Sequence, residues 1–254
     1  HSVITTVNSA LTSAIAPSSN AVYDQGTSLV LTATASGGTT SYTYNFFVYN
    51  SISHVQVGNY LSPATTSLTQ NYVYPINAAN AGNTLVANVF ISDGSGNALQ
   101  VISGQSGIFT VNAALTSSIA PSSNTIYDQG TSVIWTATAT GGTQPYTYNF
   151  FVYNSISQVQ MGNYLISGVA STTQTYAYPI NGVNAGNTLV ANVYISDSSG
   201  NIIRVLSGQS GIITVNSALT SAIAPSSNAV YDQGTSLVLT ATASGGTTSY
   251  TYNF

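Results

Sequence analysis

The chain has 254 residues, of which 43% are hydrophobic and only 2% are charged, and it contains no cysteine. Ordinary globular domains are about 25% charged, so the chain lacks the Lys and Arg side chains that phosphate contacts need, which excludes nucleic acid as a partner. The hydrophobic content excludes a disordered chain, and no apolar run reaches the ~18 residues of a membrane-spanning helix, so we expect no transmembrane segment.

The chain consists of copies of one repeat. A nearly constant run, VNSALTSAIAPSSNAVYDQGTS in its first occurrence, starts at Val7, Val111 and Val215, so the period is 104 residues. A period of about 100 residues suits one β-sandwich, which is long enough to bury its own core without a metal or a disulfide. The sequence therefore predicts tandem domains.

The repeat gives the domain boundaries in chain order. We expect 1–6 to be the last strand of a preceding repeat, and 7–110 and 111–214 to be two complete domains. Residues 215–254 form a partial third copy, which we expect to continue beyond this sequence or to be completed by a neighbouring chain. The third copy is identical to the first over its length, whereas the first two match at 75 of 104 positions. The true unit is therefore expected to be a pair of domains.

Turn residues divide the first repeat into short strands without helical periodicity. Apolar and polar residues alternate along 28–35, which is typical of a half-buried strand, and 42–50 is the most aromatic segment. Residues 23–26 (YDQG) predict a turn, because Asp bonds to nearby backbone and Gly accepts a positive φ. The predicted strands are 10–16, 28–35, 42–50, 54–60, 70–76, 84–92, 98–102 and 107–111.

About seven strands per repeat, with turns every 8–12 residues, predict an all-β fold of tandem immunoglobulin-like β-sandwich domains. No linker separates one repeat from the next, because the last predicted strand runs within a few residues into the following copy. Such short junctions predict a stiff array rather than flexibly tethered domains.

Three phrases carry a resemblance to a known class of domain. They are TSLVLTATASGGT followed by YTY in 27–44, GGTQPYTY in 141–148, and ANVFISDGSGN in 87–97. They resemble the Ig-like repeats of prokaryotic surface proteins, namely the polycystic-kidney-disease-type (PKD) domains and the SprB-type adhesin repeats. The chain departs from PKD domains at 46–50, where FFVYN stands in place of their Trp-x-Phe-Gly-Asp-Gly. The resemblance implies a structural spacer or adhesive module on an archaeal or bacterial surface.

Groups for catalysis are nearly absent. The chain has no Glu, Lys or Cys, and His54 is replaced by Gln158 in the second repeat, so no nucleophile or acid–base pair recurs. We therefore expect no enzymatic activity and no cofactor.

The recurrent aspartates are the only candidates for metal ligands. Asp24 and Asp128 lie in YDQG, and Asp93 and Asp197 lie in DGSGN and DSSGN. Calcium usually takes six to eight oxygens with several carboxylates, so one Asp per loop could form only a weak site. The alternative interpretation is that each Asp caps its turn. Gln25 and Thr27 leave a third possibility, a Thr–Gln ester cross-link, which some surface Ig-like domains contain.

The chain contains 18 tyrosines. Aromatic side chains on exposed strands can stack on sugars, whereas Tyr also suits a strand face on which the ring packs and the hydroxyl stays wet. We consider the tyrosines of the aromatic strand a possible adhesive or assembly surface: Tyr42, Tyr44, Tyr49, Tyr146, Tyr148 and Tyr153.

The sequence thus predicts an extracellular structural protein that forms a fibre, filament, stalk or surface-layer element through self-association. The alternative is an adhesin whose Tyr-rich strands and loops bind surface glycans. The most divergent segment, 62–66 against 166–170, is the candidate for a variable binding tip or a packing contact. Because so few groups titrate, the surface suits strong acid, as on an acidophilic archaeon. The alternative is that the low charge is typical of secreted repeat arrays rich in Ser, Thr and Asn, whatever their habitat.

Overall fold

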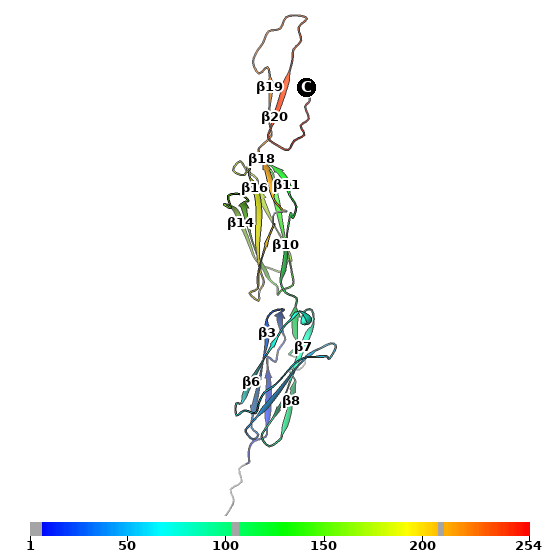
Figure 1. Cartoon of the computed structure of the whole chain (residues 1–254), viewed down its shortest axis with the longest axis vertical. Helices are drawn as coiled ribbons and strands as arrows, with labels where there is room; N and C mark the ends of the chain where they lie inside the picture. The colour runs from blue at the N-terminus through cyan, green and yellow to red at the C-terminus, as the bar shows by residue number, and fades with distance from the viewer. Residues whose placement is uncertain (1–6, 103–106, 208–210) are drawn as a thin grey trace, which may run out of the picture. The chain divides into compact units, whose positions relative to one another are not determined.

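A computed structural model of the chain describes residues 7–102, 107–207 and 211–254. Their contacts form two compact units, His1–Thr116 with Thr140–Thr143, and Ser117–Ala139 with Gln144–Phe254. Strands make up most of each unit (Figure 1). The repeat boundaries 7–110, 111–214 and 215–254 stay predictions, and the strand predicted for 1–6 lies outside the described residues.

Unit 1 is a two-layer β-sandwich. One layer is a three-stranded sheet in the order β1-β3-β6, and the other has the order β2-β9-β7-β4-β5 with β8 also paired to β7. A single 3-10 turn, η1 (Ala78–Asn80), precedes β7. The strands are β1 (Thr12–Ala16), β2 (Ala21–Asp24), β3 (Ser28–Ser36), β4 (Thr43–Asn50), β5 (Gln56–Leu61), β6 (Thr69–Pro75), β7 (Thr84–Ser92), β8 (Ala98–Ile102) and β9 (Phe109–Asn112).

Unit 2 repeats this topology in the second copy, with sheets β10-β12-β15 and β11-β18-β16-β13-β14, and β17 paired to β16. Its strands are β10 (Thr116–Ala120), β11 (Thr125–Asp128), β12 (Ser132–Thr140), β13 (Tyr146–Asn154), β14 (Gln160–Val169), β15 (Thr173–Pro179), β16 (Thr188–Ser196), β17 (Ile202–Leu206) and β18 (Ile213–Asn216). The third copy adds one antiparallel pair, β19 (Thr220–Ala224) with β20 (Thr240–Ser244).

Strand alternation builds the core between the two layers. Every second residue of β3 points inward, so that Leu29 and Leu31 are fully buried, and β4 and β7 bury alternate residues in the same way. In the second repeat Trp135 occupies the position of Leu31 and is also fully buried. Its indole Nε1 has no hydrogen-bond partner among the described residues. The two cores therefore share a pattern and differ at three buried positions, where Val133, Trp135 and Ile213 replace Leu29, Leu31 and Phe109.

Most predicted strands agree with the structure within one or two residues at each end, and the all-β prediction is confirmed. The prediction for 23–26 was incomplete, because Tyr23 and Asp24 belong to β2 and the turn follows them. β2 pairs in parallel with β9, from Ala21 opposite Phe109 to Asp24 opposite Asn112. No short-range pattern marks a four-residue strand whose partner lies almost a whole repeat away.

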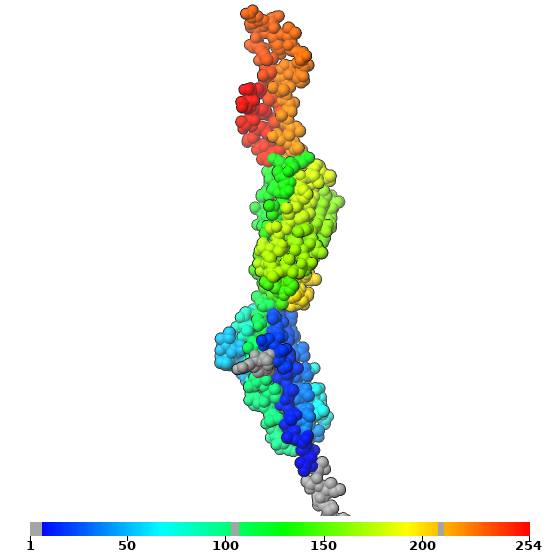
Figure 2. All heavy atoms as spheres, turned by 180° about the vertical axis from the view of Figure 1, so that it is seen from behind, coloured from blue at the N-terminus to red at the C-terminus, as the bar shows by residue number. Residues whose placement is uncertain are grey.

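The third copy exposes apolar side chains whose counterparts the first copy buries. Its sequence matches the first copy, yet Leu237, Leu239 and Phe254 are 53%, 44% and 75% exposed, whereas their counterparts Leu29, Leu31 and Phe46 in the first copy are fully buried. Figure 2 shows this segment, orange to red, as a thin layer of atoms. Residues 215–254 therefore lack packing partners equivalent to the strands that 47–110 supplies in the first copy.

The divergent segment lies at the edge of the larger sheet. In the first repeat β5 ends at Leu61 and only the Tyr42–Thr65 bridge follows, whereas in the second repeat β14 continues to Val169. Ser62 is buried, and its hydroxyl accepts a hydrogen bond from the backbone N–H of Tyr44 at 2.9 Å. This segment thus sets the length of the edge strand.

Candidate functional site

The aspartate of the DGSGN turn is surrounded by hydrogen-bond donors. Asp93 Oδ1 accepts from the backbone N–H of Ser95 at 3.0 Å and of Asn97 at 2.9 Å. Oδ2 accepts from the Thr39 N–H at 3.0 Å and from Asn97 Nδ2 at 2.9 Å. Turn capping therefore accounts for Asp93 without calcium, because N–H groups occupy its acceptor positions. Asp197 has the equivalent contacts with Ser199 and Asn201.

The aspartate of the YDQG turn also faces donors. In unit 1, Asp24 is fully buried, and its Oδ1 accepts from Asn112 Nδ2 at 3.2 Å and from Thr143 Oγ1 at 2.7 Å. Asp128 has the equivalent partners Asn216 and Thr247 in unit 2. Among the described residues no three His, Cys, Asp or Glu side chains come together as a metal site.

The candidate cross-link residues have separate partners. Thr27 Oγ1 donates to the carbonyl of Asp24 at 2.7 Å, and Gln25 Oε1 accepts from the N–H of Ala114 at 3.4 Å. The ester stays a prediction that intact mass decides, since its formation releases ammonia.

The contacts of Asp93 predict a pH-dependent stability of the first repeat. The Asn97 side chain, followed by the Thr39 N–H, holds the pKa of Asp93 below its ordinary value of 3.8. A depressed pKa means that the stabilisation is complete above the unfolded-state pKa of about 4 and is lost as the pH falls towards the folded-state pKa. We expect the melting temperature of the first repeat to fall between about pH 4 and pH 2.

Asp93→Asn is the matched control. Its amide nitrogen cannot accept from the surrounding N–H groups, so we expect a lower melting temperature at pH 7 and a smaller dependence on acid. The melting temperatures of the variant and the parent protein should converge as the pH falls, because protonation removes the parent carboxylate. Curves that stay parallel from pH 7 to pH 2 would contradict this role.

The structure corrects four of the six predicted surface tyrosines. Tyr42 and Tyr146 are 3% exposed, and Tyr44 and Tyr148 are fully buried, because their positions on the aromatic strand face the sandwich interior. Burial raises the pKa of Tyr148 to about 12, with Tyr146 adding to the rise and the Ala139 backbone opposing it. These rings belong to the core and cannot present a face to a ligand.

The other two tyrosines lie on the outer face of the larger sheet. Tyr49 and Tyr153 are half-buried, and each stacks on a neighbouring phenylalanine of the same strand, with ring centroids 6.2 Å and 6.4 Å apart. In the second repeat, Phe151 also meets Tyr194 of β16 edge to face at 5.9 Å. A row of aromatic rings therefore runs across β13 and β16.

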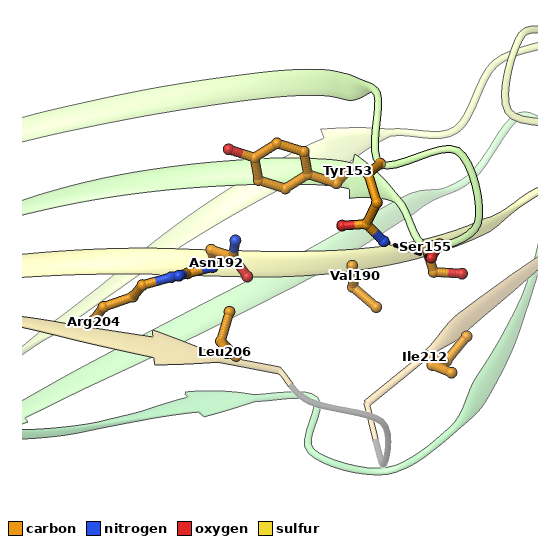
Figure 3. Close-up of a pocket in the computed structure, with 8 residues that line it drawn as sticks. Tyr153, Ser155, Val190, Asn192, Arg204, Leu206 and Ile212 are labelled. Atoms are coloured by element: carbon orange, nitrogen blue, oxygen red, sulfur yellow. Dashed lines mark hydrogen bonds between the residues drawn. The ribbon is translucent and has the colours of Figure 1, made fainter.

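A hollow of about 670 Å³ lies beside this row on the second repeat. Its lining comes from β13, β16 and β17, the turn that follows β13, and the segment before β18 (Figure 3). Apolar and neutral polar side chains surround one cation. The lining residues are Tyr153, Ser155, Gln158, Val190, Asn192, Arg204, Leu206 and Ile212.

Arg204 is the cation, and two neighbours hold its side chain. Its guanidinium carbon lies 5.6 Å from the centroid of the Tyr194 ring, an arrangement attractive for a cation over an aromatic face. The amide of Asn192, oriented to satisfy both its partners, donates to the Ala191 carbonyl and accepts from Arg204 Nη2, each at 3.1 Å. Arg204 is exposed, and none of the described residues forms an ion pair with it.

The first repeat has the same frame without the cation. Gln100 stands at the position of Arg204, and His54 stands at that of Gln158. Asn88, the counterpart of Asn192, has its Oδ1 buried with no partner among the described residues. Sequence reasoning did not assign a role to Arg204, although its place as the chain's single Lys or Arg, aligned with a glutamine, was the available signal.

No protein-family model matches the sequence, and no curated protein matches it. Solved structures do. A marsupial T cell receptor has a TM-score of 0.51 at 11% identity, over 88% of this chain and 78% of the receptor chain. A three-Ig fragment of titin has a TM-score of 0.48 at 8% identity, over 89% of this chain and 84% of the titin fragment. A bacterial ice-binding adhesin has a TM-score of 0.42 at 13% identity, over 84% of this chain and 68% of the adhesin chain. The fold is therefore that of tandem immunoglobulin-like domains.

No helix in the described part of the chain is both long and apolar enough to cross a membrane.

Proposed function

We propose that the chain is a structural segment of an extracellular prokaryotic surface protein, in which Ig-like repeats serve as chemically inert spacers of a fibre, filament, stalk or surface layer. The observation that carries this proposal is the contrast between core and surface. Each complete repeat buries a continuous apolar core without disulfides, while only 2% of all residues are charged. The protein performs no catalysis in this proposal, and its function follows from length and inertness.

The resemblance of the GGTQPYTY and ANVFISDGSGN phrases to PKD-type and SprB-type repeats supports a place on an archaeal or bacterial surface. The scarcity of titratable groups further supports an acidic habitat, since hydroxyls and amides gain no charge as the pH falls. The Asp93 turn is a place where acid would act on the fold, because its hydrogen bonds hold the pKa of that carboxyl below its ordinary value.

Electron microscopy of native material tests the proposal. We expect regular fibres or an ordered layer with a repeat along the long axis that corresponds to the domain pair. Isolated, irregular particles in native preparations would contradict a fibre or layer. Labelling with antibodies against the second repeat assigns the observed structure to this chain.

The second candidate function is that of a glycan-binding adhesin. The exposed aromatic row and the hollow around Arg204 favour it over a purely inert surface.

A further inference from the structure

We propose that the hollow around Arg204 in the second repeat binds the carboxylate of an acidic saccharide, a uronate residue of a polysaccharide. The inference goes beyond the structural role proposed above and does not depend on it. It gives the second repeat a recognition function that the first repeat lacks.

Charge provides the first argument. Arg204 is the single Lys or Arg among 254 residues, in a chain of net charge −4. A guanidinium carries five N–H donors arranged to bind a carboxylate with two parallel hydrogen bonds. The side-chain oxygen of Asn192 accepts a hydrogen bond from Arg204 Nη2. None of the described residues provides a carboxylate for the other guanidinium nitrogens. The binding partner that best complements this group is therefore an anion.

Pre-organisation provides the second argument. Arg side chains on a surface normally lose much rotamer freedom when they bind. Here the ring of Tyr194 supports the guanidinium at 5.6 Å and Asn192 fixes one end at 3.1 Å. Because Asn192 is buried on β16, the cation is held against the sheet before a ligand arrives, and the entropic cost of binding is lower.

The lining provides the third argument and selects a sugar among anions. The Tyr153 ring, Val190 and Leu206 offer apolar surface. Two neutral polar groups also line the hollow: the amide of Gln158, whose nitrogen donates to the Ser155 carbonyl at 2.6 Å, and the hydroxyl of Ser155, which is bonded to that of Thr188. A pyranose ring has the same division, with C–H groups on its faces and hydroxyls around its edge. The volume of about 670 Å³ lies within the range of small-molecule sites, which combine apolar walls with a few placed polar groups.

The two repeats provide an internal comparison. Tyr49, Val86 and Asn88 reproduce the frame of the hollow in the first repeat, but Gln100 replaces the cation. Arg204→Gln therefore gives the second repeat the first repeat's residue, on an exposed strand position where the fold already accepts glutamine. Gln100→Arg makes the reverse change.

Titration calorimetry of the full chain with trigalacturonic acid tests the proposal, and the methyl ester of the same trisaccharide provides the uncharged control. We expect one site per chain for the acid, weaker binding as salt is raised, and at least about tenfold weaker binding of the ester, as expected for losing a charge-assisted bidentate pair. Arg204→Gln should weaken binding of the acid to the level of the ester at an unchanged melting temperature. The affinity of Arg204→Lys for the acid should lie between those of the parent protein and Arg204→Gln, because an ammonium lacks the planar arrangement of donors of a guanidinium.

Gln100→Arg, made together with His54→Gln, should raise the stoichiometry from one site to two. The proposal is overturned if trigalacturonic acid does not bind, if Arg204→Gln binds it as well as the parent protein, or if the double variant gains no second site. An acidic tetrapeptide that binds as tightly as the trisaccharide would show that the site recognises a carboxylate alone, and this too would overturn the assignment to a saccharide. Regular native fibres without saccharide binding would leave the structural role intact while removing this inference.

Discussion

Replacing Gly37 with alanine is expected to destabilise the first repeat by about 4 kcal/mol, near the upper limit for single substitutions. Gly37 has a φ of +70°, in the left-handed region that costs other residues about 1–2 kcal/mol. A Cβ there would also lie 2.2 Å from the carbonyl oxygen of Ala10 and 2.8 Å from Ser9 Oγ. Because the nearest atom is backbone next to β1, the strand itself would have to move.

Gly26→Ala is the matched control for this prediction. Gly26 has a φ of +92°, yet a Cβ there would meet no atom within 4 Å. Gly26→Ala should therefore lower the free energy of unfolding only by the backbone strain of the left-handed region, about 1–2 kcal/mol. Amide hydrogen exchange followed by mass spectrometry measures the opening free energy of β1 and β3 in the intact chain. Equal losses in the two variants would show that the contact with Ala10 carries no energy.

Trp135→Ala is expected to destabilise the second repeat by about 3–5 kcal/mol, the range measured for large aromatic side chains removed from cores. Trp135 lies on β12 and is fully buried between the two layers of the sandwich. Its removal loses the transfer free energy of the ring and leaves a cavity that the rigid strands cannot close.

Two further variants on β12 test how the loss of stability depends on burial and on the volume of the buried side chain. Ile134→Ala, whose side chain is 57% exposed on the opposite face, should change stability by less than about 0.5 kcal/mol. Trp135→Leu should cost less than the alanine variant, because leucine, the residue at this position of the first repeat, fills more of the space that the ring leaves. Hydrogen exchange in β12 measures all three. A leucine variant as unstable as the alanine variant would contradict the dependence of the loss on cavity volume.

Local alternation was sufficient to predict β3, β4 and β7, because a strand with one buried face repeats its apolar residues with a period of two. The same pattern could not say which face of the aromatic strand is inside. Both faces of 42–50 carry aromatic residues, and the choice depends on the second layer packed against Tyr44 and Phe46. The prediction of an adhesive surface at Tyr42 and Tyr44 was therefore wrong, while Tyr49 remains on the outer face.

The hollow around Arg204 depends on contacts that no local pattern contains. Arg204, Asn192 and Tyr153 come from three strands, and their neighbourhood follows from the register of β16 with β17 and of β13 with β16. The alignment of the repeats shows that Arg204 stands where the first repeat has Gln100. That Arg204 belongs to a binding site can be inferred only from the Tyr194 ring and the Asn192 amide beside it.

The parallel pairing of β2 with β9 determines how a repeat responds to a pulling force. β2 is the second strand of the repeat and β9 is its last, the two run parallel, and four residue pairs join them in register. Tension between the two ends therefore pulls the strands along each other, so their hydrogen bonds are loaded together rather than broken one after another. We expect each repeat to resist extension until this pair fails as a whole, which would let a chain without disulfides carry mechanical load.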